Sequence, residues 1–263
     1  MSSSVMYDEK SHAHITTNED LRMALGFFMP KDCNRVLTVV ASGDHPLFCS
    51  LYGAKYVDTF DITQNAKLIM DIKTAAIGLL KRDEYARMLE NLWWRDDALT
   101  APFMDKVSAK LPAGEYEYLC SMRGTRLFNK DTWDGRDSKY LTIDFEYEKL
   151  QKIIKEPYNF IKTDIVNLSA YLSQSYDFIH LSNIFDHIEN PETHWNIIQP
   201  LLKRLNVGGR LVSYSLFGYP KQFSKNSMKD TKLAESILQD YNLKWYLTGL
   251  TNMDTLTVFE RVR

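Results

Sequence analysis

The sequence lacks the patterns that mark several common classes of protein. Its 263 residues contain only three cysteines, Cys33, Cys49 and Cys120, which are odd in number and have no ligand-like spacing. We therefore expect neither a disulfide framework nor a metal site, and the cysteines suit a reducing cytoplasm. No apolar run approaches the roughly 20 residues of a membrane span. The sequence thus predicts a cytoplasmic protein with no integral membrane segment.

A strong excess of charge is also missing. The formal net charge is -2 at pH 7, which gives neither the basic footprint of a nucleic-acid-binding protein nor a polybasic membrane patch. The N-terminal stretch has no basic region followed by an apolar one, so it does not resemble a secretory signal. Hydrophobic residues make up 44% of the chain and charged residues 25%, as in ordinary globular proteins. We expect no nucleic-acid partner.

The stretch from Arg35 to Ile62 has the pattern strand, tight turn, helix, strand. Its unbroken apolar run at 36–41 is typical of a buried parallel strand, and turn residues follow at 42–44. A second strand at 56–60 ends at Asp61, close to the spacing at which an acidic residue binds ribose hydroxyls in doubly wound α/β folds. The sequence therefore predicts a Rossmann-type nucleoside site.

Strand and helix patterns then alternate along the chain. Further strands are predicted at 158–162, 176–181 and 210–216, a closing hairpin at 244–249 and 254–261, and helices at 18–28, 46–52, 64–80, 195–204 and 231–241, with a glycine stop at 206–209. Parallel strands finished by an antiparallel hairpin form the class I methyltransferase-like arrangement. We predict one α/β Rossmann-like domain over 1–263, with a mostly parallel seven-stranded sheet.

Residues 83–151 are too many for a simple connection between a helix and the next strand. They contain helical patterns at 84–91, 101–110 and near 146–154. We predict a helical lobe, inserted into the single domain and laid over the C-terminal ends of the strands, where it walls an acceptor pocket. The alternative is a helical elaboration that contributes no site residues.

The C-terminal ends of the strands carry the expected ligand site, because open parallel sheets bind ligands at this edge. The turn at 41–44 has one glycine where a pyrophosphate-binding turn needs several, which favours a ligand without phosphates; a plain tight turn is the alternative. Asp61 is expected to accept from ribose hydroxyls, to cap the following helix, or both. The predicted cofactor-binding residues are Ala41, Ser42, Gly43, Asp44, Asp61, Ile62, Gln64, Asp164, Ile165, Ser182 and Asn183.

Two later strand ends complete the prediction. Asp164 can accept from an adenine amino group while Ile165 packs on the ring, although a surface-loop aspartate explains the pattern equally well. Asp186 and His187 follow the strand at 176–181 and are the candidate catalytic residues, because a carboxylate or an imidazole can deprotonate an acceptor. The alternative is that this pair only caps or hydrogen-bonds its loop.

Two segments resemble a known enzyme family. The stretch at 36–77 and YDFIHLSNIFDHI at 176–188 are similar to S-adenosylmethionine-dependent 3-amino-3-carboxypropyl transferases, typified by the bacterial betaine-lipid enzyme acting on diacylglycerol. The family motifs are represented here by Asp61 and Gln64 after the second strand and by IKTAA at 72–76. The resemblance implies S-adenosyl-L-methionine as cofactor, a small or lipid-like acceptor, and release of methylthioadenosine.

Two other functions fit the same residues. A methyltransferase on this fold would use the same strand ends but release S-adenosylhomocysteine in place of methylthioadenosine. A nucleoside-binding protein without catalysis would bind the ligand without turnover, because a fold does not fix a function. The sequence identifies neither the acceptor nor the oligomeric state.

Overall fold

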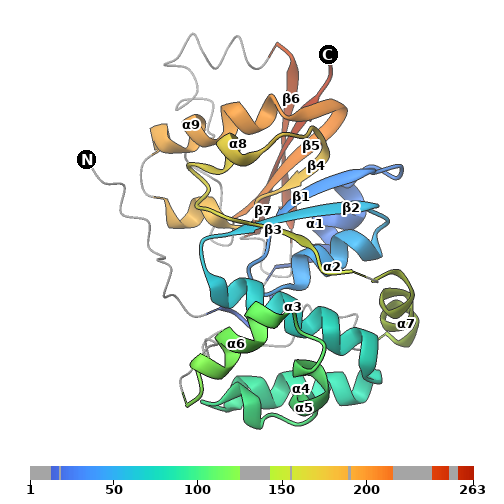
Figure 1. The fold of residues 1–263 in the computed structure, drawn as a ribbon. Coiled ribbons are helices and arrows are strands. Elements are labelled where there is room, and N and C mark those ends of the chain that lie inside the picture. Colours follow the sequence, from blue (N-terminus) through green and yellow to red (C-terminus); the bar gives the residue numbers. More distant parts are fainter. Residues whose placement is uncertain are drawn as a thin grey trace.

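The computed structural model describes residues 13–17, 19–124, 143–154, 156–188, 191–215, 239–248 and 254–263. In this part of the chain a seven-stranded sheet has the order β3-β2-β1-β4-β5-β7-β6 (Figure 1). The pairings from β3 to β5 are parallel, and β7 pairs antiparallel with both β5 and β6. The predicted mostly parallel sheet with an antiparallel C-terminal hairpin is therefore confirmed. The strands are β1 Arg35–Val39, β2 Tyr56–Asp61, β3 Asn159–Lys162, β4 Tyr176–His180, β5 Leu205–Ser215, β6 Tyr241–Thr248 and β7 Asp254–Arg261.

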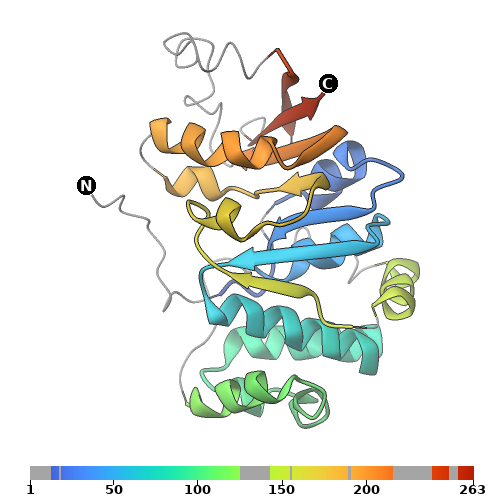
Figure 2. The ribbon, with the colours of Figure 1, turned by 45° about the horizontal axis from the view of Figure 1, so that its top comes forward.

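The central strand β1 explains why the sheet is covered on both faces. Val36 packs into the core on one face of the sheet, and its neighbour Leu37 packs into the core on the other. Because successive side chains of a strand point to opposite faces, a continuous apolar run needs helices on both sides. Figure 2 shows these helices around the sheet. They are α1 Leu21–Phe28, α2 Asp44–Leu51, α3 Gln64–Leu79, α8 Leu168–Tyr171 and α9 Pro191–Leu202, with the short 3-10 helix η3 Ile184–His187 after β4.

The order of the strands reverses between β1 and β4. The chain runs outward from β1 through β2 to β3, then returns to the other side of β1 and continues through β4 to β5. In open α/β sheets the crevice at such a reversal, at the carboxyl ends of the strands, is where ligands bind. The fold alone therefore points to the loops after β1 and β4.

The predicted insertion is a group of helices that pack on α3. It comprises α4 Arg82–Trp94, η1 Ala98–Thr100, α5 Met104–Ser108, α6 Ala113–Ser121 and α7 Asp144–Ile153. Apolar residues of α4, among them Tyr85 and Leu89, belong to the same core cluster as α3. At the far end of α3, Tyr147 of α7 donates to the carbonyl of Leu80 at 3.1 Å. The insertion thus shares one core with the sheet.

The expected position of the insertion is wrong for the helices described. Helices α4, α5 and α6 lie against the side of α3 that faces away from the sheet, and α7 packs on α2 and α3 (Figure 1). None of them lies across the strand ends. The reason is that their apolar faces complete the core around α3. Residues 125–142 of the predicted lobe lie outside the described residues.

Some predicted element boundaries are also corrected. Residues 206–209, predicted as a glycine stop after a helix, belong to strand β5, which begins at Leu205. A Cβ on Gly209 would lie 3.0 Å from the carbonyl oxygen of Tyr176, so only glycine fits beside β4. The first helix begins at Leu21, where Asp20 accepts from the backbone N–H of Met23. Of the helix predicted at 231–241, residues 231–238 lie outside the described residues, and Tyr241 starts β6.

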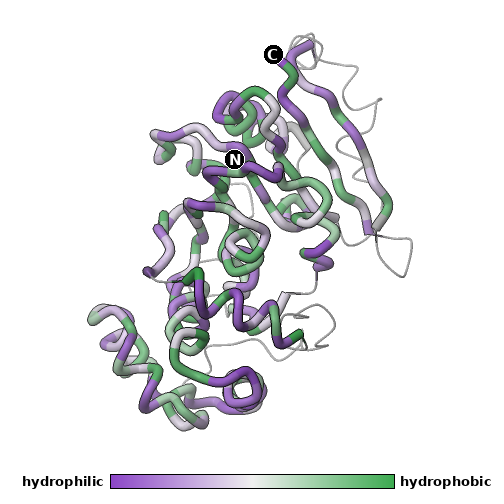
Figure 3. Tube along the Cα trace, turned by 90° about the vertical axis from the view of Figure 1, so that its right-hand side faces the viewer, coloured by the Kyte–Doolittle hydropathy of each residue, from purple (hydrophilic) through white to green (hydrophobic). Residues whose placement is uncertain are grey.

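Hydrophilic and hydrophobic stretches alternate along the chain in Figure 3. Among the described residues, no helix is long and apolar enough to cross a membrane.

One buried ion pair fastens α3 to the start of α2. The Nζ atom of Lys73 lies 2.5 Å from Oδ1 of Asp44, and both side chains are fully buried. Burial lowers the pKa of Lys73, and the Asp44 carboxylate opposes that effect only in part. The pair therefore places two charges in the interior, where removal of one partner leaves the other uncompensated.

We predict that Lys73→Met lowers the free energy of unfolding by about 3–5 kcal/mol, because it leaves the Asp44 carboxylate buried without its cation. Urea unfolding at neutral pH measures this change. The control is Arg263→Met, which removes an ion pair with Asp240 whose side chains are both more than half exposed; such pairs contribute about 0–1 kcal/mol. Equal losses for the two variants would contradict a stabilising role for the buried pair.

Candidate functional site

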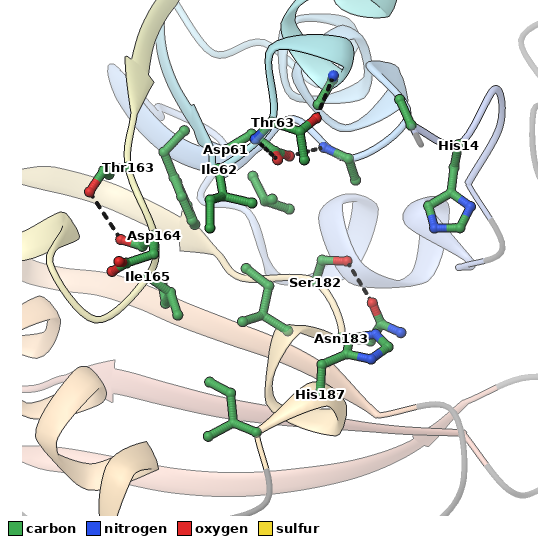
Figure 4. A pocket seen from close by; sticks show the side chains of 17 residues that line it. His14, Asp61, Ile62, Thr63, Thr163, Asp164, Ile165, Ser182, Asn183 and His187 are labelled. Carbon is green, nitrogen blue, oxygen red and sulfur yellow. Dashed lines mark hydrogen bonds between the residues drawn. The ribbon is translucent and has the colours of Figure 1, made fainter. Parts of the chain in front are cut away.

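A pocket opens at the carboxyl ends of β1, β2, β3 and β4 (Figure 4). It has an empty volume of about 870 Å³, part of it open to solvent. Its position is the reversal of strand order identified above, as expected for a ligand site. The residues that line it are 13, 14, 39, 41, 60–63, 66, 163–165, 182–184, 187 and 188.

Asp61 joins the ends of two strands inside this pocket. Its Oδ2 accepts from the backbone N–H of Ala41 at 3.0 Å, and its Oδ1 accepts from that of Thr63 at 3.1 Å. The N-cap of α3 is Thr63, whose hydroxyl accepts from Ala66 N at 2.9 Å. Since an ionised carboxylate has about four lone-pair sites, Asp61 retains capacity to accept from ligand hydroxyls.

The charge of Asp61 is sensitive to pH near neutrality. Burial raises the pKa of its carboxyl group to about 6, although the backbone N–H groups of Thr63, Ala41 and Ile62 oppose this rise. The side chain is therefore protonated in mild acid and ionised at neutral pH.

Apolar and polar residues from two strand ends form one side of the pocket. Ile62 and Ile165 contribute apolar surface to the wall beside Asp61 and Asp164. Asp164 accepts from the backbone N–H of Asn167 at 2.8 Å and from its side-chain amide. Its carboxylate thus holds the loop after β3 while lining the pocket, so the two roles predicted for it are compatible.

The loops after β1 and β4 have unusual backbone conformations. Ala41 has φ 48° and Ser182 has φ 55°, values that residues other than glycine rarely adopt. Both residues line the pocket, and each follows one of the two strands that flank the reversal of strand order. Strained non-glycine residues cluster at functional sites, so the backbone geometry agrees with the position of the pocket.

Three residues predicted from the first turn do not line the pocket. Ser42 and Asp44 are buried and hydrogen-bonded to each other, with Ser42 Oγ donating to Asp44 Oδ2 at 3.1 Å. Gly43 has φ 79°, and a Cβ there would lie 2.9 Å from the Cα of Met70 in α3. This glycine is needed for a left-handed turn and for close packing on α3.

Two further predicted residues do not line the pocket. Gln64 donates through Nε2 to Oε1 of Glu115 in α6 at 2.7 Å. Asp186 accepts from Ser215 Oγ at 2.8 Å, on β5. His187, its neighbour in η3, does line the pocket. Burial lowers the pKa of His187, which the nearby Asp186 carboxylate only partly offsets.

Sequence reasoning missed two important residues, Glu19 and His14. Glu19 is buried and accepts hydrogen bonds from Ser182 Oγ and from the backbone N–H of Asn183, the latter at 3.1 Å. His14, in the segment before α1, also lines the pocket. Glu19 and Ser182 are 163 positions apart, and no local pattern in the sequence indicates such a contact.

Among the described residues, no group of histidine, cysteine, aspartate and glutamate side chains is arranged to hold a metal ion.

No model of a protein family and no curated protein matches this chain. Solved structures of similar arrangement include an rRNA methylase from Streptococcus thermophilus (14% identity, 94% of this chain and 99% of that one, TM-score 0.43). Others are the N-methyltransferase NodS from Bradyrhizobium japonicum WM9 with S-adenosyl-L-homocysteine (11%, 92% and 84%, TM-score 0.45) and TehB from Haemophilus influenzae (16%, 93% and 62%, TM-score 0.41). Similarities at this level identify no activity. The strand order and hairpin of this chain are themselves those of a class I methyltransferase-like Rossmann fold.

The pKa of Asp61 predicts how stability depends on pH. Its pKa is about 6 in the folded protein against 3.8 for the ordinary group. Between these values the folded state holds more protons than the unfolded state, so this group's contribution to stability is lost as pH rises. We expect the difference in unfolding free energy between wild type and Asp61→Asn to fall by about 2 kcal/mol between roughly pH 4 and pH 7, measured by urea unfolding.

Asp177→Asn is the contrasting control. Burial raises the pKa of Asp177, but hydrogen bonds from Asn206 and from the backbone of Arg35 and Asn34 outweigh it and leave the pKa below its ordinary value. Its contribution is therefore present at neutral pH and lost on acidification. The same sign of pH dependence for both variants would contradict the environment assigned to Asp61.

Proposed function

We propose that this chain is an S-adenosyl-L-methionine-dependent transferase. The observation that carries the proposal is the Asp61 carboxylate, placed at the end of β2 in a pocket that Ile62 and Ile165 make largely apolar on one side. In this arrangement a carboxylate accepts from ribose hydroxyls while apolar side chains pack on a base. Asp61, Ile62, Asp164 and Ile165 would hold the nucleoside, and Ala41, Ser182 and Asn183 would line the path of its 5′ substituent.

The first turn supports a ligand that carries no phosphates. The backbone N–H of Ala41 is bonded to Asp61, that of Gly43 to the carbonyl of Val40 at 2.7 Å, and that of Asp44 to Ser42 Oγ. Phosphate-binding turns direct such N–H groups at the anion. Because this turn uses three of them internally, a sulfonium nucleoside fits the site better than a dinucleotide.

Methyl transfer is the reaction that we favour. The bound sulfonium supplies an activated carbon, and its methyl group is less hindered to attack than the methylene carbon of the amino-acid arm. Transfer from the methylene would require the protein to place the arm against the acceptor. The seven-stranded order of the sheet is that of a class I methyltransferase-like fold. This architecture is compatible with methyl transfer but does not by itself fix the reaction.

Transfer of the 3-amino-3-carboxypropyl group is the second candidate, supported by the sequence resemblance at 36–77 and 176–188. Several residues that carry the resemblance serve the fold in this structure. Gln64 bonds Glu115, Asp186 bonds Ser215, and Lys73 pairs with Asp44. The resemblance thus coincides with packing contacts, which weakens it as an indicator of the transferred group.

The acceptor would approach Asn183 and His187. Since burial lowers the pKa of His187, its imidazole is neutral at physiological pH and able to take a proton from an acceptor. We propose a small-molecule or lipid-like acceptor; the net charge of -2 is the observation that speaks against a nucleic acid.

We predict that Asp61→Asn weakens binding of S-adenosylhomocysteine by about 10- to 100-fold at pH 7.5, because hydrogen bonds to a charged acceptor are weakened. Wild-type affinity should rise with pH through about 6, where Asp61 ionises, whereas the affinity of the variant should not. Calorimetric titration measures both. Asp240→Asn, at an exposed position, is the control, and an Asp61→Asn variant that is folded and binds normally would remove Asp61 from the ribose role.

The transferred group can be identified with two labels. S-adenosylmethionine labelled in its methyl group, and separately in its carboxyl carbon, is incubated with panels of small amines, hydroxyl compounds and lipids. We predict transfer of the methyl label and formation of S-adenosylhomocysteine. Transfer of the carboxyl label with methylthioadenosine would establish the second candidate, and tight binding with no transfer of either label to any acceptor class would support a nucleoside-binding protein.

A further inference from the structure

The segment before α1 is attached to both loops that flank the reversal of strand order. We call residues 13–17 and 19 the N-terminal clasp. Its Thr17 donates its backbone N–H to Asp44 Oδ2 at 2.9 Å, beside the turn after β1. Its Glu19 accepts from Ser182 Oγ and from Asn183 N, in the loop after β4. The clasp therefore connects the two loops that border the pocket.

The side chain of Glu19 also lies beside two buried histidines. Its second oxygen, Oε2, lies 3.6 Å from Nε2 of His45 and 3.8 Å from Nε2 of His180, and all three side chains are buried. Burial alone raises the pKa of a carboxyl group, but the interactions with His45, His180 and Ser182 outweigh it and keep the pKa of Glu19 below its ordinary value. A buried anion is costly unless it is well paired. The surrounding hydrogen bonds and histidines are therefore needed to keep a carboxylate at this position.

One of the two histidines beside Glu19 is uncharged at neutral pH. Burial lowers the pKa of His180 to about 3, against the opposing effect of Glu19, so this imidazole is uncharged at neutral pH. Among the described residues, neither Nε2 of His180 nor either ring nitrogen of His45 has a partner within hydrogen-bond distance. The Glu19 carboxylate thus lies directly behind Ser182 and Asn183, which line the pocket, and His180 supplies no positive charge beside it.

The clasp also supplies one end of the pocket. Ala13 and His14 belong to the pocket wall, and in Figure 4 His14 and Asp164 lie at opposite ends, with Asp61 and Ser182 between them. A nucleoside with its ribose on Asp61 and its base toward Asp164 directs its 5′ substituent toward the end formed by the clasp. The group at the end of the 5′ substituent would therefore contact the clasp.

We propose that the N-terminal clasp forms the subsite for the amino-acid arm of the ligand, with His14 as its contact residue and Glu19 as the positioning residue that fastens it; this rests on the proposed function. The arm carries both an ammonium and a carboxylate group. A neutral imidazole donates from one nitrogen and accepts at the other, so one histidine can serve either group. Burial, His187 and His45 all lower the pKa of His14, which keeps its ring neutral.

Three ligands that share the nucleoside separate this subsite from the rest of the pocket. S-adenosylhomocysteine has the amino-acid arm, methylthioadenosine retains the thioether without it, and adenosine lacks both. Calorimetric titration at pH 7.5 is performed on wild type, His14→Ala, His14→Gln, Glu19→Gln and the control Glu146→Gln. Glu146 is likewise buried and paired, with Arg22 at 2.6 Å. Its partner Arg22 does not line the pocket, whereas Ser182 and Asn183, the partners of Glu19, do.

We expect His14→Ala to weaken binding of S-adenosylhomocysteine about 10-fold or more, with methylthioadenosine and adenosine changed less than about twofold. His14→Gln, which can donate and accept, should recover most of the loss. Glu19→Gln should weaken the same ligand selectively, because an uncharged amide oxygen accepts more weakly from Ser182 Oγ and Asn183 N and so fastens the clasp less firmly. Glu146→Gln should bind all three ligands as wild type does.

The outcomes against the subsite are distinct from those against the proposed function. The subsite would be overturned if His14→Ala lost affinity equally for all three ligands, or if neither His14→Ala nor Glu19→Gln lost affinity for S-adenosylhomocysteine. Either result would leave the nucleoside site intact. A wild-type protein that binds none of the three would overturn the proposed function itself. If Glu19→Gln does not fold, as judged by circular dichroism and thermal melting, the His14 variants decide alone, since His14 is partly exposed.

Discussion

The backbone N–H groups at the carboxyl edge of the sheet need acceptors, and side-chain carboxylates supply them. Asp61 accepts from Ala41 and Thr63, Glu19 accepts from Asn183, and Asp44 accepts from Thr17. Loops at a strand edge leave such groups without sheet partners, and a buried N–H without an acceptor costs free energy. Asp61 therefore extends the pairing of β1 and β2 beyond the ends of the strands, whereas Glu19 and Asp44 join segments that the sheet does not join. These contacts shape the pocket.

The same carboxylates make the site polar without making it basic. Lys73 pairs with Asp44 at 2.5 Å, whereas among the described residues neither Asp61 nor Glu19 forms an ion pair with a lysine or an arginine. One carboxylate in the pocket wall and a second behind Ser182 and Asn183 favour a cationic ligand, such as the proposed sulfonium, over a phosphate. The rare backbone conformations of Ala41 and Ser182 occur at two residues of this same pocket.

The sequence allowed the strands, and with them the edge at which the pocket opens, to be predicted, because apolar runs and turn residues are local signals. Asp61 could be placed in the site for that reason. Gly43 and Asp186 could not be assigned from sequence, since the direction of a side chain after a strand depends on loop dihedrals and on neighbours such as Met70 and Ser215. Glu19 was missed because its partners come from the tertiary fold alone. The insertion was predicted from its length, but an amphipathic pattern does not say which surface its helix covers.

The distribution of these contacts bears on how the transferred group is chosen. The stretch at 36–77 is held together by packing of the first turn on α3, through Gly43 against Met70 and Asp44 with Lys73. Two enzymes with different reactions could share that stretch because both need the same turn packed on the same helix. The choice between a methyl group and the amino-acid arm must then be made where the arm and the acceptor meet, between the loop after β4 and the segment that Glu19 fastens to it. Under the function proposed above, differences in reaction should therefore be encoded in the pocket residues 13, 14, 182–184, 187 and 188, and not in the packed stretch at 36–77.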